Sequence, residues 1–88
     1  MKREKMSFLD YLCDVTECNP LPGYRLQVKC SDGAAGIFDM SGYLNRGMFK
    51  TLRDEALFNQ VRIVAGAPTW PGNIDVAPER VRSDMIPA

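Results

Sequence analysis

The chain has 88 residues, of which 45% are hydrophobic and 25% are charged, and its 11 basic residues balance its 11 acidic residues. A chain of this length supports one hydrophobic core, so we expect a single domain over residues 1–88. The balanced charge argues against a nucleic-acid face or a basic membrane-binding helix, and no stretch approaches the roughly 20 apolar residues of a membrane span.

The first residues are polar, and we expect residues 1–7 to form a flexible tail. Lys2, Arg3 and Lys5 precede Phe8, as in the charged start of a secretion signal, but Asp10 interrupts the apolar run that such a signal requires. The chain is therefore expected to be cytoplasmic. Its three cysteines are expected to be reduced, because a chain rich in large apolar residues does not need disulfides.

Three strands are predicted in the first half of the chain. The first covers residues 12–18 and is expected to stop at Asn19-Pro20-Leu21-Pro22-Gly23, because two prolines remove backbone donors there. Residues 24–30 alternate between apolar and polar side chains, which is typical of a strand with one buried face. Asp32-Gly33 then predicts a turn into a returning strand over residues 34–40.

The length of this turn decides which side chains face each other. A two-residue loop would place Leu26 opposite Asp39 and bring a carboxylate to the apolar side. A three-residue loop with a left-handed Gly33 instead places Leu26 opposite Phe38, and we predict this register. It leaves Ile37 on the polar face, where a helix, a second copy of the chain or a partner must cover it.

The second half of the chain predicts shorter elements. Residues 41–50 indicate a helical turn and a loop, and Asp54 is a candidate N-cap for a helix over residues 55–60. Residues 61–64 and 68–70 predict a second hairpin, and Pro78 is well placed to begin a closing helix over residues 78–84. The expected fold is α+β, with a small antiparallel or mixed sheet of about five strands in the order β-β-β-α-β-β-α and with the helices packed on one face.

The sequence contains no histidine, which removes the commonest general base and the commonest metal ligand. Cys13 and Cys18 have opposite parity on a strand, and Cys30 has no paired cysteine close in sequence, so core packing is favoured over a zinc site. The glycines do not form a phosphate-binding loop. We therefore expect no catalytic residue, no metal, no cofactor and no enzymatic activity.

The remaining candidates are surface contacts. Asp32 is explained by its turn, and Asp39 is either the cross-strand partner of Arg25 or part of a polar pocket with Asp75. The single tryptophan is either a core residue or, if exposed, an interaction anchor together with arginine and tyrosine side chains. The candidate interaction residues are Ile37, Tyr43, Arg62, Trp70 and Asp75.

Four stretches of the chain resemble a known family. They are residues 28–39 with Asp32-Gly33, the Leu-Arg-Asp-Glu-Ala-Leu-Phe run at 52–58, the strand at 61–64 and the Trp-Pro-Gly-Asn-Ile-Asp-Val-Ala-Pro-Glu run at 70–79. Together they cover about residues 12–81 and are similar to the domain of unknown function 2442 family, although Gly72 here precedes Asn73 where the family usually has a polar residue before the glycine. The resemblance implies a small bacterial α+β domain, found alone or ahead of a helix-turn-helix domain, and we expect no helix-turn-helix within these 88 residues. It brings no known activity.

These observations lead to one expected function and two alternatives. The chain is expected to be a non-enzymatic protein-interaction or dimerisation module, acting as a homodimer or with a protein partner. The first alternative is a regulatory domain that binds a small ligand or nucleic acid. The second is an enzyme assembled across a dimer interface from Asp39, Asp75 and Arg62.

Overall fold

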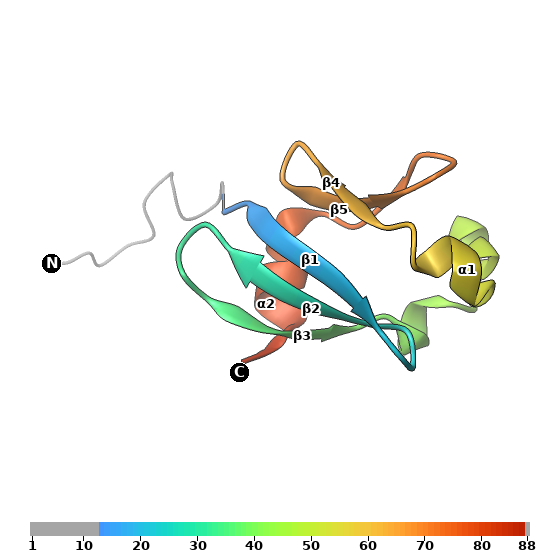
Figure 1. The fold of residues 1–88 in the computed structure, drawn as a ribbon, viewed down its shortest axis with the longest axis horizontal. Helices are drawn as coiled ribbons and strands as arrows, with labels where there is room; N and C mark the ends of the chain where they lie inside the picture. Colours follow the sequence, from blue (N-terminus) through green and yellow to red (C-terminus); the bar gives the residue numbers. More distant parts are fainter. Residues whose placement is uncertain (1–12, 88) are drawn as a thin grey trace, which may run out of the picture.

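Short strands and helices follow one another along residues 13–87, the part of the chain that the computed structural model describes (Figure 1). The predicted tail at residues 1–7 lies outside this part. The α+β class and the order of the predicted elements are confirmed. The elements are β1 (Val15–Leu21), β2 (Arg25–Cys30), β3 (Ala35–Asp39), the 3₁₀ helices η2 (Ser41–Tyr43) and η3 (Gly47–Arg53), α1 (Glu55–Phe58), β4 (Arg62–Val64), β5 (Ala67–Trp70), β6 (Ile74–Asp75), α2 (Pro78–Asp84) and β7 (Ile86–Pro87).

The strands form two antiparallel sheets and not the single sheet that was expected. One has the order β1-β2-β3-β7 and the other the order β4-β5-β6. The two sheets meet where the Val15 N–H donates to the Gly66 carbonyl over 2.8 Å. The strands β6 and β7 were not predicted, because two residues are too few to show an alternating pattern.

The prediction that the first strand stops at residue 19 is wrong, because β1 runs further. It continues through Pro20, which pairs with Leu26, and ends at Leu21. Proline is tolerated here because β1 is the edge of its sheet, where a missing N–H removes no bond to a further strand. The reversal comes at Pro22, Gly23 and Tyr24, and the last two have φ values of 84° and 60°.

The hairpin of β2 and β3 has the predicted register. Leu26 lies opposite Phe38, and Arg25 lies opposite Asp39. The Cys30 N–H donates to the Ala34 carbonyl over 2.8 Å, which leaves three residues in the turn, and Gly33 has a φ of 91°. Glycine is favoured at this position because a left-handed conformation costs other residues about 1–2 kcal/mol.

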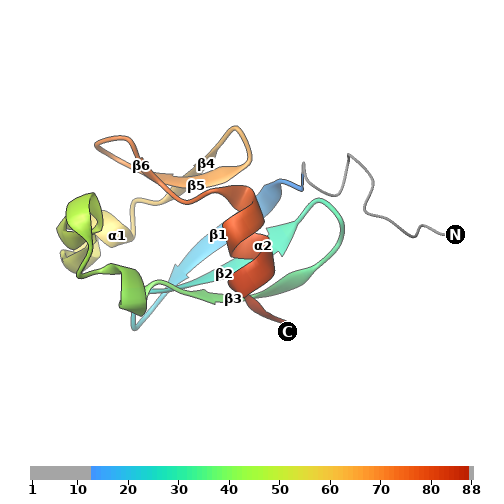
Figure 2. The ribbon, with the colours of Figure 1, turned by 180° about the vertical axis from the view of Figure 1, so that it is seen from behind.

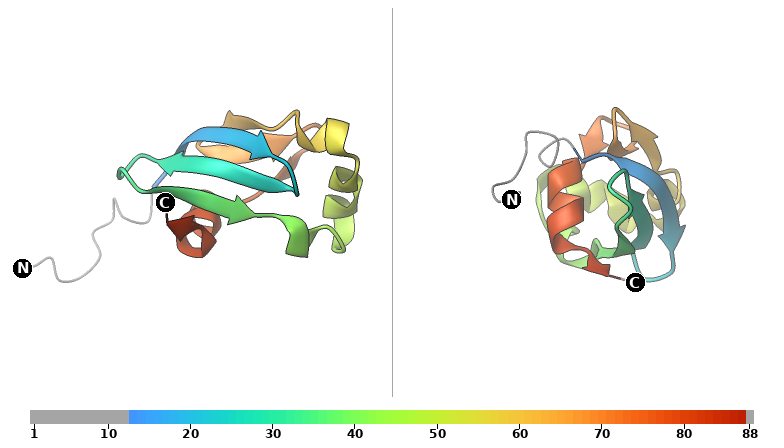
Figure 3. Two further views of the ribbon diagram at one scale, coloured as in Figure 1. Left: turned by 60° about the horizontal axis from the view of Figure 1, so that its bottom comes forward. Right: turned by 90° about the vertical axis from the view of Figure 1, so that its left-hand side faces the viewer.

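Helix α2 crosses the inner face of the four-stranded sheet, and the second hairpin lies beside β1 (Figures 2 and 3). Val81 of α2 is fully buried against the core, while α1 and η3 lie at one end of the sheets rather than on the face. No helix in residues 13–87 is long and apolar enough to cross a membrane. The largest buried side chains are Trp70, Phe38, Phe58, Leu26, Met40 and Leu52.

Trp70 is a core residue, 1% exposed, which decides between the two alternatives that the sequence left open. Its indole Nε1 donates to the Phe58 carbonyl over 2.8 Å, and the two rings stack with their centroids 5.8 Å apart. The bond satisfies the polar atom of a buried indole and joins β5 to α1. Asp54 caps α1 as predicted, because its carboxylate accepts from the Ala56 N–H over 3.0 Å.

The second hairpin turns through Ala65 and Gly66, which have φ values of 52° and 79°. Two successive residues with positive φ between paired Val64 and Ala67 form the two-residue hairpin turn that favours Asn-Gly. Ala65 is therefore a strained residue at a position where asparagine is tolerated.

We predict that Ala65→Asn raises the free energy of unfolding by about 0.5–1 kcal/mol, because asparagine adopts the left-handed conformation more readily than alanine. Urea denaturation followed by circular dichroism measures this change. The matched control is Ala56→Asn in α1, which should lower stability through weaker helix propensity. A decrease for Ala65→Asn would contradict the assignment of this turn.

Candidate functional sites

The five residues predicted as interaction contacts lie in three separate places. Ile37 points away from α2 on the four-stranded sheet. Tyr43 is half-buried, with its ring centroid 5.7 Å from that of Phe38 and 5.6 Å from that of Phe49. Tyr43 thus belongs to an aromatic cluster that closes one end of the core. The other three residues belong to the three-stranded sheet.

On the three-stranded sheet, Arg62 lies opposite Thr69, and Thr69 lies opposite Asp75. Arg62 and Asp75 are exposed, while Trp70 points inward. A hollow of about 400 Å³ lies beside this row, between Arg62, Val64 and the turn at residues 71–73. Among the described residues that line the hollow, Arg62 is the one ionisable group, and these residues offer no pair of groups for acid–base chemistry.

The face of the four-stranded sheet that points away from α2 is a second candidate surface. No described element covers this face, which points toward the viewer in Figure 1, with α2 behind the sheet. Ile37 lies opposite Ile86 of β7, and Ile86 is 66% exposed. We call this surface the outer face. By register it comprises Glu17, Asn19, Leu21, Arg25, Gln27, Lys29, Ala35, Ile37, Asp39 and Ile86.

The charged residues of the outer face alternate in sign. Lys29 lies opposite Glu17. Arg25 lies opposite Asp39, and this second position was predicted. The predicted side-chain pairing of Arg25 with Asp39 is not formed, because each side chain binds nearby backbone instead. Arg25 Nε donates to the Pro22 carbonyl over 3.1 Å, and Asp39 accepts from the Ser41 N–H over 2.8 Å. The bonds from Ser41, and then the charge of Arg25, hold the pKa of Asp39 below its usual range.

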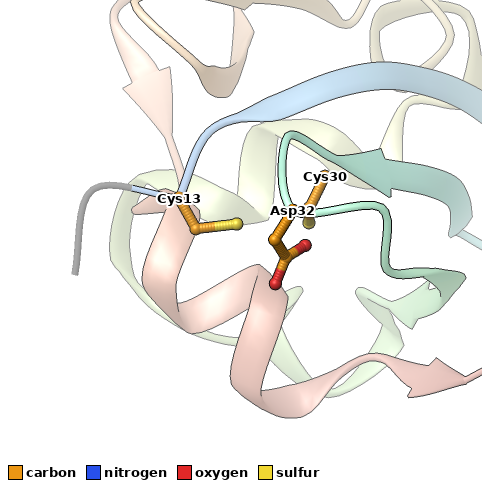
Figure 4. Close-up of side chains that lie close together, drawn as sticks. All are labelled: Cys13, Cys30 and Asp32. Carbon is orange, nitrogen blue, oxygen red and sulfur yellow. The ribbon is translucent and has the colours of Figure 1, made fainter. Parts of the chain in front are cut away.

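A third cluster joins the start of β1, the end of β2 and the turn that follows β2 (Figure 4). The sulfur atoms of Cys13 and Cys30 and a carboxylate oxygen of Asp32 lie within 4.8 Å of one another. Both thiols are buried, whereas Asp32 is exposed. Burial, and next the neighbouring Cys13, raises the pKa of Cys30 to about 11. Sequence reasoning compared Cys13 with Cys18 and so missed that Cys13 lies beside Cys30.

Asp32 also ties the turn to the closing helix. One carboxylate oxygen accepts from the Ala34 N–H over 3.1 Å, which is the predicted turn bond, and the other accepts from Arg82 Nε over 2.9 Å. The Ala34 bond first, and then Arg82, lower the pKa of Asp32. Fifty residues separate Asp32 from Arg82, so no local pattern in the sequence signals this ion pair.

One comparison with known proteins finds a match. A family model described as a protein of unknown function, DUF2442, matches residues 15–83, and this confirms the family resemblance seen in the sequence. No curated protein and no solved structure matches the chain. The candidate sites must therefore be judged on their own chemistry.

We predict that Asp32→Asn lowers the free energy of unfolding at neutral pH by about 0.5–1 kcal/mol, since the ion pair is exposed and screened by solvent. A lowered folded pKa makes this contribution fully present above the unfolded value of about 3.9. It is lost as the pH falls through the lower folded pKa, so the wild type and the variant should then become equally stable.

Thermal unfolding between neutral pH and about pH 2 checks this convergence at the acid end. Arg82→Gln and the double variant complete a cycle whose coupling free energy should be about 0.2–1 kcal/mol. A stability difference that does not change with pH would show that the charge of Asp32 contributes nothing.

Proposed function

The chain belongs to the DUF2442 family, and because that family has no assigned function, we propose a role from the surfaces of this chain: a non-enzymatic interaction module that forms a homodimer through its outer face. The observation that carries the proposal is the pair formed by Ile37 and Ile86. Both lie on a sheet face that no described element covers. Full burial of a side chain of this size contributes about 1.5–3 kcal/mol.

The two edge strands of the four-stranded sheet are poorly suited to pairing with a further strand. They therefore favour contact through the face of the sheet. Edge β1 contains Pro20 and an irregularity in register between Val15 and Glu17. The opposite edge, β7, has two residues and includes Pro87. Proline, irregular register and short length all prevent a further strand from pairing. An added strand is therefore a poor fit, whereas a flat apolar pair on the face remains free to pack.

The charges favour a second copy over a strongly charged partner. The outer face carries cations and anions one strand apart, so it has no potential of a single sign to attract an acidic or basic protein. An identical face offers an anion for each cation. The zero net charge of the chain also removes the repulsion between copies that keeps many small domains apart.

The size of the outer face predicts a weak dimer. Four strands span about 19 Å and five residues about 17 Å, which is a small footprint for a protein interface. Interfaces of this size associate weakly and reversibly. We therefore expect a dissociation constant in the micromolar range or above, with the dimer appearing as the concentration rises.

We predict that sedimentation velocity of the full chain shows a concentration-dependent shift from monomer to dimer. Ile37→Lys and Ile86→Lys should each abolish the shift, because a lysine ammonium would be buried in the interface without a partner. The matched controls are Val64→Lys and Met48→Lys, which place the same change at exposed apolar residues outside the outer face.

The controls should dimerise as the wild type does. A chain that stays monomeric up to millimolar concentration would overturn the proposal. Equal association of the wild type and the Ile37→Lys variant, with circular dichroism showing both folded, would reject this face as the interface.

A further inference from the structure

Cys13, Cys30 and Asp32 bring two thiols and a carboxylate together from parts of the chain that are up to 19 residues apart. Two features set this arrangement apart from ordinary core packing. The two sulfur atoms are buried side by side, and a carboxylate closes the solvent side of the pair (Figure 4).

The spacing of the three ligand atoms suits a small thiophilic cation. Tetrahedral zinc, with bonds of about 2.3 Å to sulfur and 2.0–2.2 Å to oxygen, holds such atoms about 3.6–3.8 Å apart. The three atoms here are already within 4.8 Å of one another. Binding of zinc would therefore bring these three atoms closer together by up to about 1 Å.

The charges around the cluster also fit the binding of a divalent cation. Two thiolates and one carboxylate exceed the charge of a divalent cation by one unit, and Arg82 supplies the balancing positive charge from α2 at 2.9 Å from Asp32. The Arg82 bond and the Ala34 N–H hold the carboxylate beside the thiols. An oriented ligand of this kind is typical of metal sites, whose ligands are held by further hydrogen bonds.

We propose that Cys13, Cys30 and Asp32 form a binding site for a thiophilic divalent cation, with zinc as the best fit, and that Arg82 orients and neutralises the site. Thiolate ligands select zinc and cadmium over magnesium and calcium, which prefer oxygen alone. Three protein ligands leave a fourth position for water or for a ligand from outside the chain. Binding displaces the proton of each thiol into solvent, so the affinity rises with pH.

The site is tested by titrating the full chain with Co²⁺, a spectroscopic substitute for zinc, under reducing and oxygen-free conditions. We expect a sulfur-to-cobalt charge-transfer band in the near ultraviolet and the visible bands of tetrahedral cobalt. Added Zn²⁺ should remove both, and Mg²⁺ should not. Zn²⁺ should also raise the unfolding temperature, because a ligand that binds the folded state stabilises it.

Two variants and one matched control test the ligand set. Cys13→Ser should abolish the charge-transfer band, and Asp32→Asn should weaken cobalt binding by about tenfold or more while leaving the fold intact, since Asp32 is exposed. The matched control is Cys18→Ser, a change at the half-buried cysteine of β1 that lies opposite Val28, outside the cluster. It should bind cobalt as the wild type does.

The absence of a charge-transfer band in the folded wild type would overturn the proposal. So would wild-type affinity in both Cys13→Ser and Asp32→Asn, or loss of the band in folded Cys18→Ser. Asp32→Asn keeps the test valid if a cysteine variant fails to fold, because the effect of this surface change does not depend on the core.

Discussion

The three-residue turn between β2 and β3 sets the register on which the outer face and the cluster of Cys13, Cys30 and Asp32 depend. With Gly33 in a left-handed conformation, the Cys30 N–H bonds the Ala34 carbonyl and the two strands pair from there onward. A shift of one residue would exchange the inner and outer sides of one strand relative to the other. Phe38 would then lose its place in the core, and Asp32 would no longer lie above the thiol of Cys30. The turn therefore determines both the packing of Phe38 in the core and the position of Asp32 beside Cys30.

The two sides of the four-stranded sheet differ in composition and in burial. Its inner side is covered by α2, and the described residues there, such as Leu26 and Val28, are almost completely buried. Its outer side carries charges of both signs around Ile37 and Ile86, with Leu21 and Ala35 on the same side by register. The thiol and carboxylate cluster lies at one end of the sheet and is tied to α2 through Arg82. The proposed association and the proposed cation binding can therefore be tested independently, because they involve different residues.

Several elements were predictable because their signals are local. The alternation along β2, the Asp32-Gly33 turn, the Asp54 cap and the proline that begins α2 each act within a few residues, and the structure confirms all four. The end of β1 was predicted wrongly, because the effect of Pro20 depends on whether the strand has a neighbour on its far side. The split into two sheets was also missed, since nothing in strands of two to four residues records which sheet they join.

The sequence by itself determined the family, the α+β class, the register of the first hairpin and the lack of any histidine for catalysis, because each of these is set by residue type or by spacing along the chain. Tertiary structure decided the rest. It buried Trp70 against the Phe58 carbonyl, and it placed Ile86 beside Ile37 on an open face. It also brought Cys13 to Cys30 and Arg82 to Asp32. These contacts join residues 12 to 50 positions apart, so they arise only when the sheets and α2 pack together.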